Sequence, residues 1–277
     1  MLDSTCDLPH AQFRHANWRV VPLHIHFGLE DYRDHVDLDA DAFYRRLRES
    51  PVHPHSSQPS PGEFIECIEH LGNYERVLVL TVSSRLSGTF RSARLAAEAL
   101  GPERVLVLDG ASVSAGTVLL ADAIQRRLER GTTEEDVVAL IDRLHGRSGY
   151  IFTVATLEYL IRGGRVSRAA GVAGELLSTK PILRIADGEI VVVKRVRGRT
   201  RALAELERSF VSETPDGAAI HAALVHADAR SDMDRLAERV QEVRSRASLD
   251  HRLVFGPVIG ANAGPGALAL AWLVEDP

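Results

Sequence analysis

Residues 76–100 have the sequence RVLVLTVSSRLSGTFRSARLAAEAL, and this stretch decides the fold class. Its first part, Arg76–Val82, is a run of valine and leucine that predicts a buried strand. Small hydroxylated residues follow, and Thr89–Leu100 then has the pattern of an amphipathic helix that Gly101-Pro102 ends. The apolar residues of that helix share one face, which holds Phe90, Ala93, Ala97 and Leu100. A strand and a helix joined in this way form the unit of a parallel sheet.

The same unit repeats further along the chain. Arg104–Leu108 is a second apolar run, a turn of small residues follows it, and Gly116–Arg130 has the pattern of a helix that Gly131 ends. Two more helices are expected at Asp41–Glu49 and Glu134–His145. Consecutive units of this kind predict an α/β fold with a doubly wound, mostly parallel sheet.

The pattern changes in the second half of the chain. The turn Ala186-Asp187-Gly188 leads into the β-branched run Glu189–Lys194, which is typical of a hairpin. Further elements are expected as two strands, Ala218–His226 and Arg252–Ile259, and two helices, Leu157–Arg162 and Ser231–Arg246. We therefore expect two lobes, with residues 1–150 carrying the parallel sheet and residues 151–277 an α/β arrangement around a mixed or antiparallel sheet. The chain can cross between these lobes more than once.

Composition limits the function classes. The 277 residues include 45% hydrophobic and 26% charged residues, as in globular proteins, and the net charge of −5 argues against nucleic-acid binding. The two cysteines, Cys6 and Cys67, are too few for a disulfide framework. No apolar run approaches the roughly 20 residues of a membrane-spanning helix, and the N-terminus lacks the pattern of a secretory signal. A cytoplasmic protein is expected, with at most a peripheral or transient membrane contact.

Three segments place small hydroxylated residues between a strand and a helix. They are Asp3–Pro9, Ser83–Thr89 and Asp109–Gly116. Such turns lie at the carboxyl edge of a parallel sheet, where open α/β folds bind ligands. In the second segment, Gly88 lets the backbone approach a ligand, and the following helix offers unpaired N–H groups to a carboxylate or phosphate. The alternative is that Ser87 or Thr89 only caps this helix.

Two other segments are rich in proline or glycine. In His55–Phe64 the prolines restrict the backbone and can hold hydroxyl groups in place, although the segment alone predicts only a loop with Ser60 capping a helix that begins at Pro61. Pro257–Gly266 contains three glycines and two prolines, which predict a tight turn that a ligand or backbone can approach closely. It lacks the spacing and the lysine of a phosphate-binding loop.

Together and in this order, these segments resemble the motifs of the DegV family of bacterial fatty-acid-binding proteins. The matching stretches are DSTCDLP from Asp3, SSQPSPGEF from Ser56, SSRLSGTFRSA from Ser83 and DGASVSAG from Asp109. They continue with LEYLIRGGRVS from Leu157, STKPIL from Ser178, DGEI from Asp187 and GPVIGANAGPG from Gly256. Each motif is weak alone, but as a set they span nearly the whole chain.

The resemblance implies a protein that encloses one long-chain fatty acid in an apolar tunnel at the lobe junction, and that needs no cofactor. The residues expected at the fatty-acid carboxylate are Ser56, Ser57, Ser87, Gly88 and Asn262. The resemblance also implies a partner kinase that phosphorylates the carboxylate to an acyl phosphate, so the chain would be a carrier and not itself an enzyme. Burying a 16-carbon tail contributes on the order of 10 kcal/mol, at about 0.8 kcal/mol per methylene.

The family's kinase contact is expected at four arginines, Arg165, Arg197, Arg199 and Arg201. Arg165 lies in the GGR motif, whereas the other three continue an odd-numbered series that begins at Arg195. Alternation along a strand would place the whole series on one face. The alternative is a solvated strand edge whose charges prevent aggregation.

Three positions depart from the family pattern. Asn262 stands where a histidine is normal; its amide can donate a hydrogen bond but cannot become a cation. Ser56 replaces a threonine, which conserves the hydroxyl group. The family's apolar first strand is reduced to Met1-Leu2 before the Asp3 motif, so we expect either a replacement element or a start upstream of the recorded one.

Two other interpretations compete with a carrier. In a serine-dependent hydrolase or acyltransferase acting on a lipid-like substrate, Ser87 or Ser57 would be the nucleophile, His226 or His55 the base, and Asp109 would orient that base. The chain has no G-x-S-x-G sequence, which disfavours this reaction. A metal site could use two histidine pairs, His24 with His26 and His53 with His55, but no accompanying carboxylate pair is evident, and no metal is expected.

Overall fold

The computed structural model describes residues 1–72, 74–166 and 179–275, whose strands form three sheets. The first sheet has the order β2-β1-β6-β7, and its pairings are parallel. Its strands are β2 (Val20–Val21), β1 (Leu2–Asp3), β6 (Val77–Thr81) and β7 (Val105–Asp109). Leu2 and Asp3, at the start of the DSTCDLP motif, therefore do form a short strand, which lies between β2 and β6.

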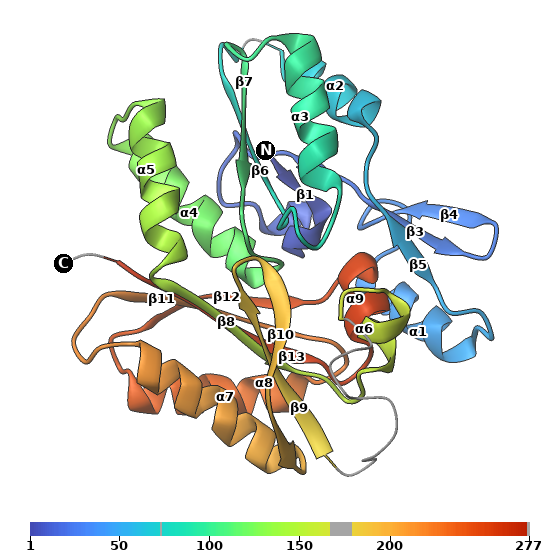
Figure 1. Ribbon diagram of the computed structural model, residues 1–277, viewed down its shortest axis with the longest axis vertical. Coiled ribbons are helices and arrows are strands. Elements are labelled where there is room, and N and C mark those ends of the chain that lie inside the picture. The colour runs from blue at the N-terminus through green and yellow to red at the C-terminus, as the bar shows by residue number, and fades with distance from the viewer. Residues whose placement is uncertain (73, 167–178, 276–277) are drawn as a thin grey trace.

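Helices cover both faces of this sheet (Figure 1). The helices on one face are α2 (Pro61–Glu69) and α3 (Thr89–Leu100), and those on the other are α4 (Ala115–Glu129) and α5 (Glu134–His145). Side chains of β6 alternate between the two faces, because Val77 and Val79 pack in a core with α3, whereas Leu78 and Leu80 pack in the core that contains α4. The predicted doubly wound parallel arrangement is confirmed.

The second sheet has the order β10-β9-β8-β13-β11-β12. Its strands are β10 (Glu189–Arg197), β9 (Thr179–Ala186), β8 (Ser148–Thr153), β13 (Leu268–Val274), β11 (Ile220–His226) and β12 (Ser248–Val254). Only the β11–β12 pairing is parallel, so the predicted mixed sheet and the hairpin at Asp187-Gly188 are both confirmed. One face is covered by α7 (Arg199–Glu213) and α8 (Arg230–Val243), and the other meets α4, which therefore lies between the two large sheets.

A third, antiparallel sheet of order β4-β3-β5 lies beside them. Its strands are Glu30–Arg33, His24–Phe27 and His55–Ser57. The remaining elements are the helices α1 (Ala40–Glu49), α6 (Glu158–Arg162) and α9 (Pro257–Ala263) and the 3₁₀ turns η1 (Ser4–Cys6) and η2 (His10–Gln12). In Figure 1, α6 and α9 lie side by side next to this sheet, and α9 packs against both β3 and β5.

Most predicted helices agree with the structure, but the apolar face of α3 is rotated slightly. Ala93 and Ala97 are buried as predicted, whereas Phe90 and Leu100 are only half-buried. The predicted capping of α2 by Ser60 is confirmed: the Ser60 side chain accepts the Glu63 amide, and Glu63 bonds back to the Ser60 amide.

Two predictions about strands were wrong. The strand predicted at Arg252–Ile259 begins and ends earlier, at Ser248–Val254, because Pro257 starts α9 and a proline fits the first position of a helix. The arginine series does not lie on one strand, because β10 ends at Arg197 and Arg199 and Arg201 belong to α7.

Some sequence predictions are not tested. The division at residue 150 falls inside β8 and stays a prediction. The end of the LEYLIRGGRVS motif at Ser167 and the start of STKPIL at Ser178 lie outside the described residues. Within the described part of the chain, no helix combines the length and apolarity needed to cross a membrane.

Candidate ligand-binding site

A cavity of about 80 Å³ lies where the three sheets meet, and we call it the junction cavity. Its walls come from the loop after β6, the turn before α4, β5, the strands β8 to β10, and α9. Most of the lining is apolar. Representative apolar residues are Val82, Val113, Phe152, Ile190, Phe255 and Val258.

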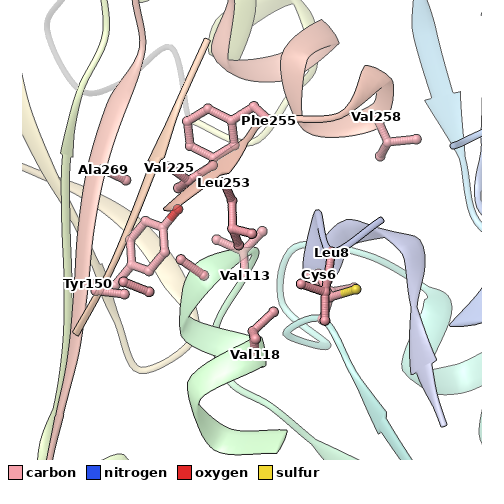
Figure 2. Close-up of a cluster of buried hydrophobic side chains, with 14 of the residues drawn as sticks. Cys6, Leu8, Val113, Val118, Tyr150, Val225, Leu253, Phe255, Val258 and Ala269 are labelled. Carbon is pink, nitrogen blue, oxygen red and sulfur yellow. The ribbon is translucent and has the colours of Figure 1, made fainter. Parts of the chain in front are cut away.

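The buried end of this cavity is continuous with the main hydrophobic core. Figure 2 shows Val113, Tyr150, Phe255 and Val258 in one cluster with Cys6 and other residues of the parallel sheet and α4. These four side chains also line the junction cavity. The space between the two large sheets is therefore mostly filled by packed side chains, and the cavity continues that apolar interior toward the surface.

The opposite end of the cavity is polar. Four of the five predicted carboxylate residues line it: Ser56, Ser57, Ser87 and Asn262. The Asn262 Nδ2 group donates to Val258 O at 2.8 Å and lies 3.4 Å from Ser56 Oγ. Sequence segments that are far apart thus supply one cluster of neutral hydrogen-bonding groups.

Gly88, the fifth predicted residue, lies directly behind this end. A Cβ atom at Gly88 would lie 2.0 Å from Oε1 of Gln58, which lines the cavity. Gly88 is the N-cap residue of α3 and no side chain caps the helix there; Ser87 accepts only the Thr89 amide, at 3.3 Å. The alternative that Ser87 only caps the helix therefore stays open, because Ser87 does accept the first amide of α3. The Gln58 side chain packs closely on Gly88 and would have to move if Gly88 carried a Cβ atom.

Arg165 lines the junction cavity, although the sequence placed it at a partner contact. It is half-buried, its Nε donates to Leu86 O at 3.3 Å, and burial lowers the pKa of its guanidinium. Among the described lining residues it is the only charged one, and no acidic side chain in the described ranges pairs with it. A buried guanidinium without a carboxylate partner is costly, so the site favours an anion.

In the GGR motif, the backbone of Gly163 lies directly against the Asn262 side chain of α9. A Cβ atom at Gly163 would lie 2.1 Å from Asn262 Oδ1. The C-terminal end of α6 therefore lies against the Asn262 side chain, and Arg165 follows two residues later. This packing places the segment that carries Arg165 beside α9, and both Arg165 and Asn262 line the junction cavity.

The hairpin formed by β9 and β10 covers one side of the junction cavity. Ile185 and Ile190 line the cavity from the two strands of the hairpin. At the turn, the buried Ser83 Oγ donates to Gly188 O at 2.7 Å, and Arg85 pairs with Glu189 at 2.7 Å on the surface. The loop after β6 therefore fixes the tip of the hairpin.

Buried aspartates connect the segments after β1 and β4 to the start of α9. Asp7 accepts the Gly256 amide at 2.8 Å, and Asp34 accepts the Val258 amide at 3.3 Å and Ser4 Oγ at 2.7 Å. Burial raises the pKa of Asp34 to about 7, although the nearby His35 opposes that shift. In the DSTCDLP segment the carboxylates thus have a structural role, and it is Thr5 that lines the cavity.

The other predicted partner arginines lie away from the cavity lining. Arg197 and Arg201 are exposed, whereas Arg199 is half-buried and pairs with Asp232 at 2.7 Å. Arg195 and Arg197 remain on one strand, where they are opposite Pro181 and Thr179 of β9. Only these two members of the series can share a strand face.

The catalytic residues predicted for a hydrolase do not assemble as expected. His226 accepts the Ala229 amide at 3.2 Å, Asp109 accepts the Ser84 and Ala111 amides, and Ser87 bonds to Thr89. The sequence missed a different arrangement, in which Ser57 Oγ lies 2.9 Å from His26 Nε2 and His26 Nδ1 lies 3.4 Å from Asp31 Oδ1. A signal was available in the alternation of β3, which places His24 and His26 on one face.

The histidines do have carboxylate neighbours, which corrects the sequence-based view. His24 lies 3.0 Å from Asp31 and 2.7 Å from Glu63, and its ring stacks on His26. Burial lowers the pKa of His24, but the hydrogen bonds to Glu63 and Asp31 outweigh it and raise that pKa overall. Over the described residues, no group of three or more histidine, cysteine or acidic side chains has a geometry suited to a metal ion.

The fold and the cavity define an α/β protein of three sheets with a largely apolar interior site that is also lined by neutral polar side chains and one arginine. The sequence pattern of the DegV family, described as uncharacterised protein, DegV family, matches residues 1–275, and the chain belongs to that family. A DegV domain-containing protein of Halalkalibacterium halodurans is 33% identical, with 99% of this chain and 97% of the relative covered.

Two similar proteins have names that refer to a ligand. A protein of Thermotoga maritima named as a fatty acid-binding protein is 33% identical, with 97% of this chain and 94% of the relative covered. A solved structure described as showing fatty acid binding of a DegV family protein from Thermus thermophilus superimposes with a TM-score of 0.89 at 33% identity. That similarity covers 99% of this chain and 98% of the other.

Proposed function

We propose that this protein binds one long-chain fatty acid, with the hydrocarbon tail in the junction cavity and the carboxylate at its polar end. The observation that carries the proposal is the junction cavity itself, which is apolar inside and has Arg165 as the only charged residue of its described lining. Ser56, Ser87 and Asn262 supply hydrogen bonds to the carboxylate, and Arg165 supplies the positive charge that Asn262 cannot carry.

The cavity must widen to accept such a ligand. Its volume of about 80 Å³ is smaller than the roughly 150 Å³ that holds a benzene molecule, so a long acyl chain needs side chains to move. The half-buried lining residues Leu86, Ile185, Ile190 and Ile259 are the ones least restrained by packing. Two of them belong to the β9–β10 hairpin, so we expect ligand entry to displace that hairpin.

Presentation to a partner fatty-acid kinase is the second part of the proposal. Ser57 and Gln58 are exposed although they line the cavity, so the carboxylate end lies near the surface. Arg197 and Arg201 are exposed cations that can contact the kinase. The protein then acts as a carrier in the cytoplasm, needs no cofactor, and leaves the phosphoryl transfer to its partner.

Native mass spectrometry tests the binding step. Protein purified from cells should carry an added mass equal to one fatty acid, and delipidated protein should regain one palmitate per chain. Hexadecanol, which has the same tail and no charge, should bind at least tenfold more weakly, because a charge-assisted hydrogen bond contributes about 1.5–3 kcal/mol. Absence of a fatty-acid adduct both before and after palmitate addition would refute the proposal.

Reconstitution with a purified bacterial fatty-acid kinase and ATP tests presentation. Acyl phosphate can be trapped with hydroxylamine and measured as the hydroxamate. The double variant Arg197→Ala/Arg201→Ala should keep palmitate affinity but reduce hydroxamate formation, whereas Arg246→Ala, an exposed arginine on a distant loop, should not. Equal rates in all three proteins would argue against this kinase contact.

The arrangement of Ser57, His26 and Asp31 favours a second candidate, a serine-dependent hydrolase or acyltransferase acting on a lipid-like substrate. Ser57 borders the junction cavity, and its hydroxyl lies 2.9 Å from the His26 ring nitrogen. A fluorophosphonate probe should then label wild-type protein at Ser57 and leave Ser57→Ala and His26→Ala unlabelled. An unlabelled wild-type protein would dispose of this activity and leave the carrier proposal intact.

A further inference from the structure

A second cavity, of about 240 Å³, lies next to the junction cavity, and we call it the hairpin cavity. It is formed by the start of α4, the turn of the β9–β10 hairpin and the strands β8 and β13. Tyr150 and Ile185 line both cavities. These two side chains therefore form the partition between the proposed acyl site and an adjoining space that is three times larger.

Tyr150 is the firmly held part of that partition. Its side chain is 4% exposed, and it pairs on the sheet with Ala271. A Cβ atom at Gly116 would lie 3.1 Å from the Tyr150 ring, so the ring packs directly against the first turn of α4. The hydroxyl end faces Ser114, whose Oγ donates to the buried Asp7.

Ile185 forms the less buried part of the partition. It is half-buried on β9, close to the hairpin turn that Ser83 holds through Gly188. A substitution at Ile185 removes atoms from the hairpin side without disturbing α4. The two residues therefore allow the partition to be opened independently from two sides.

The hairpin cavity has both apolar and polar walls, and its apolar part can take the end of a hydrocarbon chain. Its inner wall includes Leu119, Leu273 and Trp272, and its rim carries Ser112, Ser148 and the exposed Asp187. Described lining residues include no lysine or arginine, and the one residue there that can become a cation is His145. The permanent positive charge lies at Arg165, so the head group stays there and the far end of an acyl chain is the part that reaches the hairpin cavity.

We infer that Tyr150 sets the maximum acyl length by closing the junction cavity against the hairpin cavity, an inference that rests on the proposed fatty-acid binding. A chain longer than the site allows has to leave its last methylenes in water or displace Tyr150 from its packing. Opening the partition lets those methylenes enter the hairpin cavity. Each methylene buried there raises affinity about fourfold.

The test compares the affinities of palmitate, a 20-carbon and a 22-carbon saturated fatty acid in one displacement assay. Tyr150→Ala should shift the ratio of 20-carbon to palmitate affinity at least tenfold in favour of the longer chain. Tyr150→Phe keeps the ring and should leave the ratio within twofold of wild type. An unchanged ratio in folded Tyr150→Ala would overturn the inference.

A second variant keeps the test decisive if Tyr150→Ala does not fold. Ile185→Ala opens the same partition from the hairpin and should shift the ratio in the same direction, at least threefold. If Tyr150→Ala is unfolded by circular dichroism, an unchanged ratio in Ile185→Ala overturns the inference. Failure of wild-type protein to bind any of the three acids instead refutes the proposed function, so the two failures are distinguishable.

Discussion

Asn262 Nδ2 lies 3.4 Å from Ser56 Oγ, although 206 residues separate them in the chain. This distance exceeds the 2.7–3.2 Å of a normal N–H···O bond, so the contact is weak. A ligand oxygen placed between these two groups can form stronger bonds with both. The pair is therefore arranged to receive an acceptor such as a carboxylate.

The first prediction concerns this pair. Ser56→Ala and Asn262→Ala should each weaken palmitate binding about two- to tenfold, because a neutral hydrogen bond contributes about 0.5–1.5 kcal/mol. The double variant should lose less than the product of the two effects if both groups bind one carboxylate oxygen. Isothermal titration of delipidated protein measures all three. Losses larger than hundredfold for either single change would mean that the head group, and not the tail, dominates affinity.

The second prediction concerns the charge of Arg165. Arg165→Gln should weaken palmitate binding about ten- to hundredfold, since a hydrogen bond to a charged group contributes about 1.5–3 kcal/mol. Hexadecanol affinity should stay the same. Arg162→Gln is the matched control, because Arg162 is the last residue of α6, three residues before Arg165, and is exposed and paired with Glu158. If both ligands weaken equally in Arg165→Gln, the residue shapes the cavity but does not bind the carboxylate.

The third prediction concerns pH. Asp34 has a pKa of about 7 in the folded protein, against about 3.9 when unfolded. The folded state therefore binds more protons between these values, so the free energy of unfolding should fall as pH rises from 4 to 7, by up to roughly 4 kcal/mol. His35 acts in the same direction but only above about pH 6.5, because although burial lowers its pKa, the bond to Asp7 and the nearby carboxylates raise that pKa overall.

Urea unfolding at several pH values measures this dependence. Asp34→Asn removes the titrating group and should flatten the fall between pH 4 and pH 7. Asp37→Asn is the control: hydrogen bonds from Arg33 lower the pKa of Asp37 to about 2, so its contribution is lost only as pH falls below about 4. A slope in Asp34→Asn equal to that of wild type would show that other groups cause it.

The fourth prediction concerns the hairpin tip. Ser83→Ala leaves the Gly188 carbonyl without its buried donor and should lower the free energy of unfolding by about 1–3 kcal/mol. Ser84→Ala, an exposed neighbour, should change it by less than about 0.5 kcal/mol. Palmitate should also dissociate faster from Ser83→Ala, because the hairpin that covers the cavity is less firmly held. Similar palmitate dissociation rates in both variants would show that the hairpin does not control ligand exchange.

Local elements of the fold were predictable because their signals lie within a few residues of each other. The bounds of α3 and α5 agree with the sequence prediction, and Ser60 with Glu63 forms the capping box that its spacing indicates. The start of α9 was missed. Val258 and Ile259 favour strands, but Asp7 and Asp34 hold the adjoining amides and so stabilise the helix through contacts from distant segments.

The candidate site was predictable only in part. The motifs indicated Ser56, Ser57, Ser87 and Asn262, and the structure brings these residues to one cavity. The same motifs indicated a partner contact for Arg165, which stays a prediction, but did not indicate that Arg165 lines the cavity, because a local pattern does not reveal which way a side chain points after α6 packs on α9. The contact of Ser57 with His26 was missed for the same reason, since it depends on the pairing of β3 with β5.

The sequence by itself determined the α/β class and most helices, because apolar periodicity, caps and turn residues act over short distances along the chain. Its set of motifs also indicated the DegV family through their resemblance to the family pattern. Only the tertiary structure decided the direction of Arg165, the partition at Tyr150 and the burial of Asp34. Each of these depends on atoms that come together from segments far apart in the chain. Such contacts, and the desolvation that accompanies them, leave no signal in any single stretch of residues.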